Sequence, residues 1–153
     1  MYGFLFECKK IEENAHQTYR LLAKNDQYPE KLREVFLSLS DDENGHARAI
    51  DLAMQANKED LDVTPFISWE KITEAKSLSD EFLCKAQRTL VAEEDSLRMA
   101  IEMEQVFVKI HIQNALHFND KNLLELFQAL EDEDQKHIET LKDCLKWWHS
   151  TRS

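Results

Sequence analysis

The chain has 153 residues, a formal net charge of −11 at pH 7, two glycines and two prolines. This length is that of one ordinary domain with a real core, and so few turn-forming residues favour helices over an all-β fold. The acidic charge excludes non-specific binding to nucleic acid, which requires a basic surface.

The three cysteines, Cys8, Cys84 and Cys144, are far apart and form no Cys-x-x-Cys pair. This spacing argues against a disulfide framework and against a thiolate zinc or rubredoxin-type site. No apolar run approaches the roughly 18 residues of a membrane span, and the N-terminus lacks the basic opening of a signal peptide. We therefore expect a cytoplasmic protein that consists of one domain over residues 1–153 and contacts neither membrane nor nucleic acid.

The first two predicted helices cover about residues 4–25 and 29–57. In both, the apolar residues recur at alternating spacings of three and four, the pattern of a helix face that packs against a partner. Glu12 interrupts this face in the first helix, and Glu43 interrupts it in the second. His46 follows Glu43 by three residues and so lies on the same helix face, about one turn away.

The periodicity weakens from residue 58 to about residue 78, where Pro65 breaks any helix and Ser68 and Ser79 are candidate caps of short ones. The start of the next long helix stays open between Asp80 and Glu93. A connection of this length suits a crossover along a helical bundle, which makes the helices on either side of it parallel. Two more long helices are predicted at about 93–118 and 120–149, with a turn and cap at Asn119-Asp120. The predicted fold is an all-α four-helix bundle with a long crossover between its second and third helices.

The two halves of the chain look like copies of each other. Phe36, Leu39, Glu43, His46 and Ile50 each have a counterpart 91 residues later, in Phe127, Leu130, Asp134, His137 and Leu141. Glu12, Tyr19 and Ala23 have counterparts 92 residues later, in Glu104, His111 and Ala115. A repeat that keeps the acid and histidine positions predicts a pseudo-symmetric site at the middle of the bundle.

Six side chains are expected to converge there: Glu12, Glu43, His46, Glu104, Asp134 and His137. Four carboxylates in an apolar interior do not all stay ionised without cations, and two divalent ions would neutralise them beside neutral imidazoles. Oxygen and nitrogen donors together suit iron or manganese, with zinc as a further option, and leave open positions for a small molecule. Helical bundles that bind two metal ions have a known ligand arrangement, in which two helices each give one acid and the other two each give an acid-x-x-His motif.

Three further groups remain open to interpretation. Tyr19 and His111 lie two turns from an acid, where each either fills the core or hydrogen-bonds a ligand carboxylate. His16 repeats the acid-x-x-His spacing but is rotated by about 100° from the buried face, so it is expected to flank the site. The pair Trp147-Trp148 is expected to serve core packing or a dimer contact.

Four segments resemble the motifs of the ferritin-like superfamily and, within it, of the rubrerythrin-like di-iron proteins. The resemblance covers essentially the whole chain. The segments are Glu12-x-x-Ala15-x-x-x-Tyr19, Glu43-x-x-His46-Ala47, Ala100-Ile-Glu-Met-Glu104 and Asp134-x-x-His137.

This resemblance implies a ferritin-like bundle with a left-handed crossover and a carboxylate-bridged centre of two iron ions. It implies Glu12 and Glu104 as terminal ligands and Glu43 and Asp134 as bridging ligands. His46 and His137 would then give one nitrogen to each iron.

The sequence departs from the family pattern in three respects. Its 153 residues contain none of the paired Cys-x-x-Cys motifs of the C-terminal rubredoxin domain that is typical of the family, so we expect electrons to come from elsewhere. Its third helix lacks a second glutamate three residues from Glu104, where Ile101 and Phe107 stand instead. Asp134 is one methylene shorter than the usual glutamate.

The leading expectation is a homodimeric di-iron oxidoreductase that reduces peroxide or dioxygen, with Tyr19 or His111 managing protons. Its electrons would come from an external donor such as a rubredoxin-like protein. One alternative is a ferroxidase or iron-storage protein, and another is a non-catalytic bundle whose metal site is structural or vestigial.

Overall fold

The computed structural model describes residues 2–56, 69–115 and 120–152, in which all regular secondary structure is α-helical. The helices are α1 (Tyr2–Ala23), α2 (Glu30–Ala56), α3 (Trp69–Arg88), α4 (Glu93–Ala115) and α5 (Lys121–Ser150). This arrangement confirms the prediction of an all-α fold. Within the described ranges, none of these helices combines the length and the apolar character that crossing a membrane requires.

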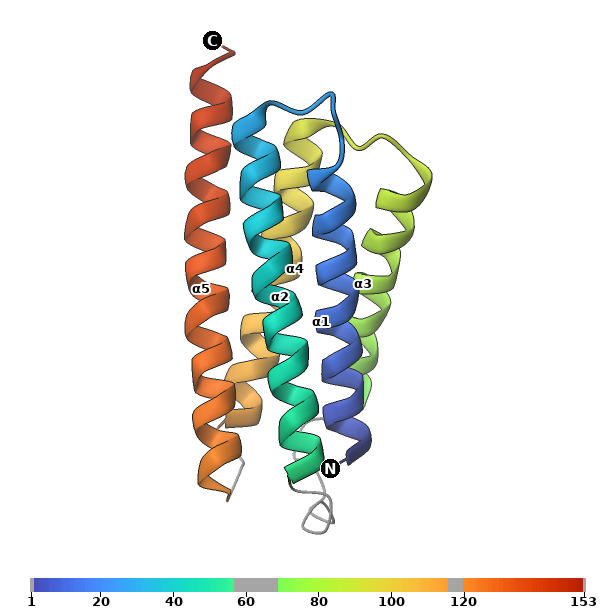
Figure 1. The fold of residues 1–153 in the computed structure, drawn as a ribbon, viewed down its shortest axis with the longest axis vertical. Coiled ribbons are helices and arrows are strands. Elements are labelled where there is room, and N and C mark those ends of the chain that lie inside the picture. Colours follow the sequence, from blue (N-terminus) through green and yellow to red (C-terminus); the bar gives the residue numbers. More distant parts are fainter. Residues whose placement is uncertain (1, 57–68, 116–119, 153) are drawn as a thin grey trace.

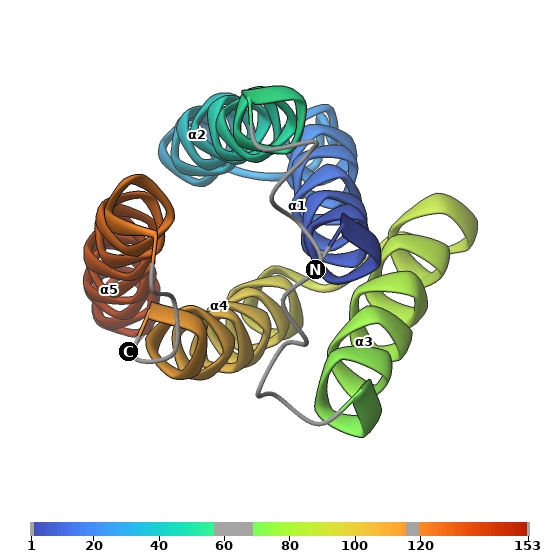
Figure 2. The ribbon, with the colours of Figure 1, turned by 90° about the horizontal axis from the view of Figure 1, so that it is seen from below.

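Four helices surround a common core, and the fifth lies outside them. Seen along the bundle, α1, α2, α5 and α4 follow one another around a ring, and α3 packs on the outside of α1 (Figure 2). The helices pair as two hairpins, α1 with α2 and α4 with α5 (Figure 1). These hairpins are the two halves of the sequence repeat. The handedness of the crossover stays a prediction, because residues 57–68 are outside the described ranges.

The helix α3 corrects the sequence analysis, which expected only short helices, capped at Ser68 or Ser79, in this part of the chain. Its buried residues are Ile72, Ala75, Ser79 and Phe82, spaced by three and four as in the other helices. Two of these four side chains are small, so the apolar face has little contrast in the sequence. The hydroxyl of Ser79 accepts a hydrogen bond of 3.0 Å from Asn14 Nδ2, which joins α3 to α1.

Helix ends follow the predicted turn chemistry where they are described. Pro29 immediately precedes α2, and its carbonyl accepts hydrogen bonds from the backbone amides of Leu32 and Arg33. Asp120 caps α5, because its carboxylate accepts from the backbone amides of Asn122 and Leu123. These contacts mark where α2 and α5 begin.

The core is formed by the predicted apolar faces, and large aromatic side chains occupy its centre. Tyr19, Phe36, Phe107 and Phe127 are each at most 1% exposed. Complete burial of one such side chain contributes roughly 1.5–3 kcal/mol. The polar residues midway along the same faces are therefore held in a dry interior.

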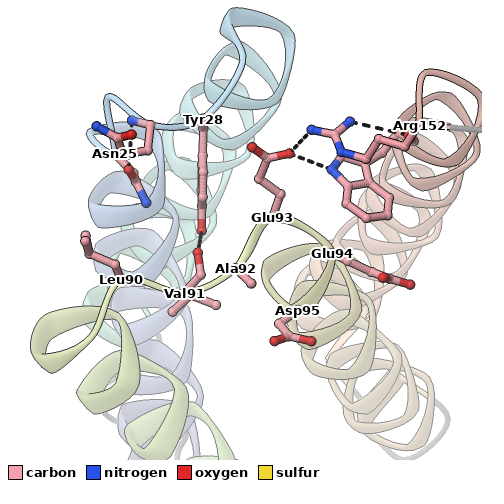
Figure 3. A pocket seen from close by; sticks show the side chains of 11 residues that line it. Asn25, Tyr28, Leu90, Val91, Ala92, Glu93, Glu94, Asp95 and Arg152 are labelled. Carbon is pink, nitrogen blue, oxygen red and sulfur yellow. Dashed lines mark hydrogen bonds and ion pairs between the residues drawn. The ribbon is translucent and has the colours of Figure 1, made fainter.

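A surface pocket of about 550 Å³ lies where the α1–α2 turn, the start of α4 and the end of α5 meet (Figure 3). The Tyr28 hydroxyl donates to the Val91 carbonyl, and Trp148 Nε1 and Arg152 both donate to the Glu93 carboxylate. Trp148 thus serves packing within the chain, one of the two roles expected for it. The polar side chains of this pocket largely satisfy one another, and none belongs to the acid and histidine repeat.

Candidate metal centre

The structure brings all six predicted ligand residues together in the middle of the bundle. Each is at most 5% exposed. They come from four helices: Glu12 from α1, Glu43 and His46 from α2, Glu104 from α4, and Asp134 and His137 from α5. Their convergence follows from the repeat, because each acid lies near the midpoint of a buried helix face.

Glu43 lies between His46 and His137, the histidines of the two acid-x-x-His motifs. Its Oε2 atom is 3.4 Å from His46 Nδ1, and its Oε1 atom is 3.1 Å from His137 Nδ1. The two imidazole rings are stacked, with centroids 5.8 Å apart. The two oxygens of one carboxylate therefore face two different imidazoles, as a bridging ligand requires.

The buried donors of the described residues form three overlapping groups with metal-ligand spacing, in each of which one atom per residue lies within 4.8 Å of all the others. One group is Glu12, His111 and Asp134, and the other two share Glu43. We call Glu12, Glu43 and His46 the Glu12 side. We call Glu43, Glu104, Asp134 and His137 the Glu104 side. Two groups that share Glu43 fit a pair of ions better than a single one.

Asp134 differs from its repeat counterpart Glu43 in where its oxygens point. Its Oδ1 atom is 3.9 Å from the Nδ1 atoms of both His46 and His137. Its Oδ2 atom accepts a hydrogen bond of 2.6 Å from His111 Nδ1. With one methylene fewer, this carboxylate directs a single oxygen to the middle of the site, and His111 holds the other.

Tyr19 and His111 both contact a ligand carboxylate, at positions related by the repeat. The Tyr19 hydroxyl donates to Glu104 Oε1 at 2.7 Å, and His111 Nε2 is 3.1 Å from Glu12 Oε1. Both side chains are buried. Of the two interpretations left open by the sequence, the structure shows contact with the acids rather than apolar packing alone.

The second acid-x-x-His segment on α1 does not join the site. His16 Nδ1 lies 2.8 Å from the Ser40 carbonyl oxygen and 2.9 Å from the Ser40 hydroxyl. These contacts join α1 to α2 beside the cluster, which agrees with the predicted flanking position.

The sequence analysis missed two residues that contact the candidate ligands, Asp42 and Glu133. Asp42 Oδ2 lies 3.0 Å from His137 Nε2, and Glu133 contacts His46 Nε2, so each acid reaches the histidine of the opposite helix. Both carboxylates are about half exposed. They directly precede Glu43 and Asp134 and are themselves 91 residues apart, which was the signal that could have revealed them.

The residues present fit a metal site because their buried polar atoms are otherwise unsatisfied. Seven such atoms have no hydrogen-bond partner in the part of the chain that the structure describes: Glu12 Oε1 and Oε2, Glu43 Oε1 and Oε2, His46 Nδ1, Glu104 Oε2 and Asp134 Oδ1. An unsatisfied buried polar atom costs about 1–3 kcal/mol. Two divalent cations would compensate this cost, with four positive charges for four carboxylates.

Without cations, the pKa values of the acids in the cluster are strongly shifted. Burial and the charges of Glu104 and Glu12 raise the pKa of Glu43 well above its usual range. Burial also raises the pKa of Asp134 to about 7, although His111 opposes the shift. Burial would raise the pKa of Glu12 too, but Glu43, His111 and His46 hold it well below its usual value. The acids therefore divide into those that keep a negative charge and those that take up a proton.

The pKa values of the histidines are raised, which favours the positive charges that compensate those of the acids. Burial disfavours a charged His111, but Asp134 and Glu12 raise its pKa to about 10. Burial likewise opposes charge on His137, and Glu104 and Glu43 raise its pKa to about 11. In the metal-free protein, protons bound to imidazoles stand in for the positive charge of the ions.

A protein-family model with the description Rubrerythrin matches residues 4–145, a range that includes every residue of the cluster. No curated protein and no solved structure matches the chain.

Proposed function

Because the chain belongs to the rubrerythrin family, we propose that its cluster holds two iron ions and that the loaded protein is an oxidoreductase. It reduces hydrogen peroxide or dioxygen with electrons from an external donor protein. The observation that carries this proposal is the set of seven buried, unpartnered ligand atoms in two groups that share Glu43. Such a set is stable only when cations or protons neutralise it.

Each side of the cluster would hold one ion. By the resemblance, Glu12 and Glu104 would be terminal ligands, Glu43 and Asp134 would be shared by both ions, and His46 and His137 would each bind one ion. When bound, a ferrous pair would supply the two electrons that, with two protons, reduce one hydrogen peroxide to two waters, and the external donor would return both electrons.

Tyr19 orients Glu104 and does not act as an acid at neutral pH. Its hydroxyl donates to Glu104 Oε1 at 2.7 Å. Burial and the neighbouring Glu104 charge raise the pKa of Tyr19 well above its usual value. The phenol therefore keeps its proton and holds one carboxylate oxygen in place, which leaves Glu104 Oε2 for a metal ion.

The proposal is tested by anaerobic loading with ferrous iron, followed by metal analysis, an optical spectrum after oxidation, and peroxide consumption with a chemical reductant. We expect close to two irons per chain, an oxo-bridged ferric absorption band and reductant-dependent peroxide turnover. Glu43→Ala and His137→Ala should abolish turnover, because each removes a ligand. Retention of metal without any turnover would instead favour a structural site and overturn the proposal.

The quaternary structure separates this function from iron storage. We propose a homodimer, which size-exclusion mass would verify. A large closed assembly would favour a ferroxidase or storage role at the same site.

A further inference from the structure

We propose that His111 is a further metal ligand, whose Nε2 atom makes the Glu12 side richer in nitrogen than the Glu104 side. This inference rests on the proposed two-metal function. It arises from a repeat-related pair in which the two halves of the cluster carry different types of side chain, Tyr19 and His111.

The contact of His111 with Glu12 is not equivalent to that of Tyr19 with Glu104. The Tyr19 hydroxyl makes an aligned hydrogen bond to Glu104 Oε1. His111 Nε2 lies 3.1 Å from Glu12 Oε1, which is within ion-pair distance, but this contact does not have hydrogen-bond geometry. Two donor atoms about 2.1 Å from one ion and at right angles around it lie about 3 Å apart. The separation therefore fits two ligands of a common ion.

The other ring nitrogen of His111 is held as in known metal-binding histidines. Its Nδ1 atom donates to Asp134 Oδ2 at 2.6 Å in a fully buried contact. A ligating histidine commonly donates its second N–H to a carboxylate, which fixes the tautomer. In a neutral ring with hydrogen on Nδ1, Nε2 carries a lone pair, which is free to bind a cation.

The same pattern recurs at the two histidines already assigned to the site. His46 and His137 each direct Nδ1 into the cluster and present Nε2 to an acid, Glu133 and Asp42 respectively. His111 does the same with its nitrogens exchanged. All three imidazoles therefore have one nitrogen paired with a carboxylate and the other beside the unpartnered acid oxygens.

Further support comes from the spacing of the donors. One ligand atom each of Glu12, His111 and Asp134 lie within 4.8 Å of one another, and all three residues are buried. With His111 included, the Glu12 side has two imidazoles, and the Glu104 side has one. Nitrogen donors favour the later first-row metals and oxygen donors favour manganese, so the two positions differ in metal preference.

The decisive measurement counts histidine ligands in the full-length protein loaded with two cobalt(II) ions. Cobalt shifts the imidazole N–H protons of its histidine ligands far outside the usual proton range, and ¹⁵N-labelled histidine identifies them. We expect three such signals in the wild type and two in His111→Tyr, which restores the phenol found at the repeat-related position. The matched control Tyr19→Phe, which removes a hydroxyl but no ring nitrogen, should keep all three.

Calorimetric titration with cobalt gives a second readout. His111→Tyr should weaken one of two binding steps by more than the roughly 10–100-fold that loss of an outer hydrogen-bond partner costs, and should leave the other step unchanged. An equal mixture of manganese and cobalt should load the wild type with one ion of each kind, which the manganese paramagnetic resonance spectrum reports. If the variant does not fold, the number of shifted imidazole signals in the cobalt-loaded wild type alone decides whether His111 is a ligand.

Two outcomes would overturn the inference, and they are distinguishable. Two bound cobalt ions with only two shifted imidazole signals would show that His111 is no ligand and would leave the proposed function intact. Failure of the wild type to bind a pair of ions would overturn both.

Discussion

Metal loading should release about four protons per pair of ions at pH 7. Metal ligands bind in their deprotonated form, so every proton on the cluster must leave. His111 and His137, with pKa values of about 10 and about 11, carry protons at this pH, and His46 is shifted in the same direction. The buried carboxyls supply the remainder, because burial and neighbouring charges raise the pKa of Glu43 well above its usual range and burial raises that of Asp134 to about 7.

This proton count sets the pH dependence of metal affinity. Each proton released changes an apparent binding constant tenfold per pH unit, so the constant for the pair should fall by about 10⁴ between pH 7 and pH 6. That factor corresponds to about 5.5 kcal/mol. If His111 stayed protonated beside the ions, the count would drop by one and the factor to about 10³.

The assay is calorimetric titration with cobalt(II) in two buffers of different ionisation enthalpy, repeated at pH 6 and pH 7. The difference in heat between buffers gives the number of protons directly. Release of no more than about one proton, or an affinity nearly independent of pH, would refute the assignment of protons to the cluster.

Three further outcomes follow from the same site. Asp42→Asn should lower metal affinity by about 10–100-fold, because it removes the carboxylate that holds His137 Nε2, whereas the neighbouring exposed Asp41→Asn should leave the titration unchanged. Glu43→Gln should raise the melting temperature of the metal-free protein above pH 7 while abolishing the binding of a metal pair. The substitution removes a carboxyl group whose pKa is raised by burial and by neighbouring charges. It also removes the ligand that the two sides of the cluster share. An unchanged melting temperature with intact pair binding would contradict both expectations. The metal-free wild type should lose stability as pH rises from about 6.5 to 9. The folded pKa values of His111 and His137 exceed that of an unfolded histidine, so the folded state binds more protons there. Thermal melts at several pH values measure this trend, and a melting temperature that rises over that range would contradict it.

Much of the fold was determined by local spacing in the sequence. The three-four alternation predicted α1, α2, α4 and α5, because a helix must bury one face. It failed for α3, whose buried residues include the small Ala75 and Ser79. A helix that packs on the outside of a bundle needs less apolar bulk, so its pattern is weaker.

The candidate ligands could also be found from the sequence, because duplication placed the same residue types at the same depth in two helical hairpins. Glu43 with His46 and Asp134 with His137 share a buried face within their own helices, and this follows from spacing alone. No knowledge of how the helices pack was needed to expect that they meet.

The contacts between helices were decided only by the tertiary structure. Asp42 reaches His137 and Glu133 reaches His46 across the α2–α5 interface, and His111 links Glu12 of α1 to Asp134 of α5. Spacing along a helix fixes the face on which a side chain lies. Which atoms of two helices come within 3 Å depends on their separation, rotation and relative height, and these are set by the packing of the whole core.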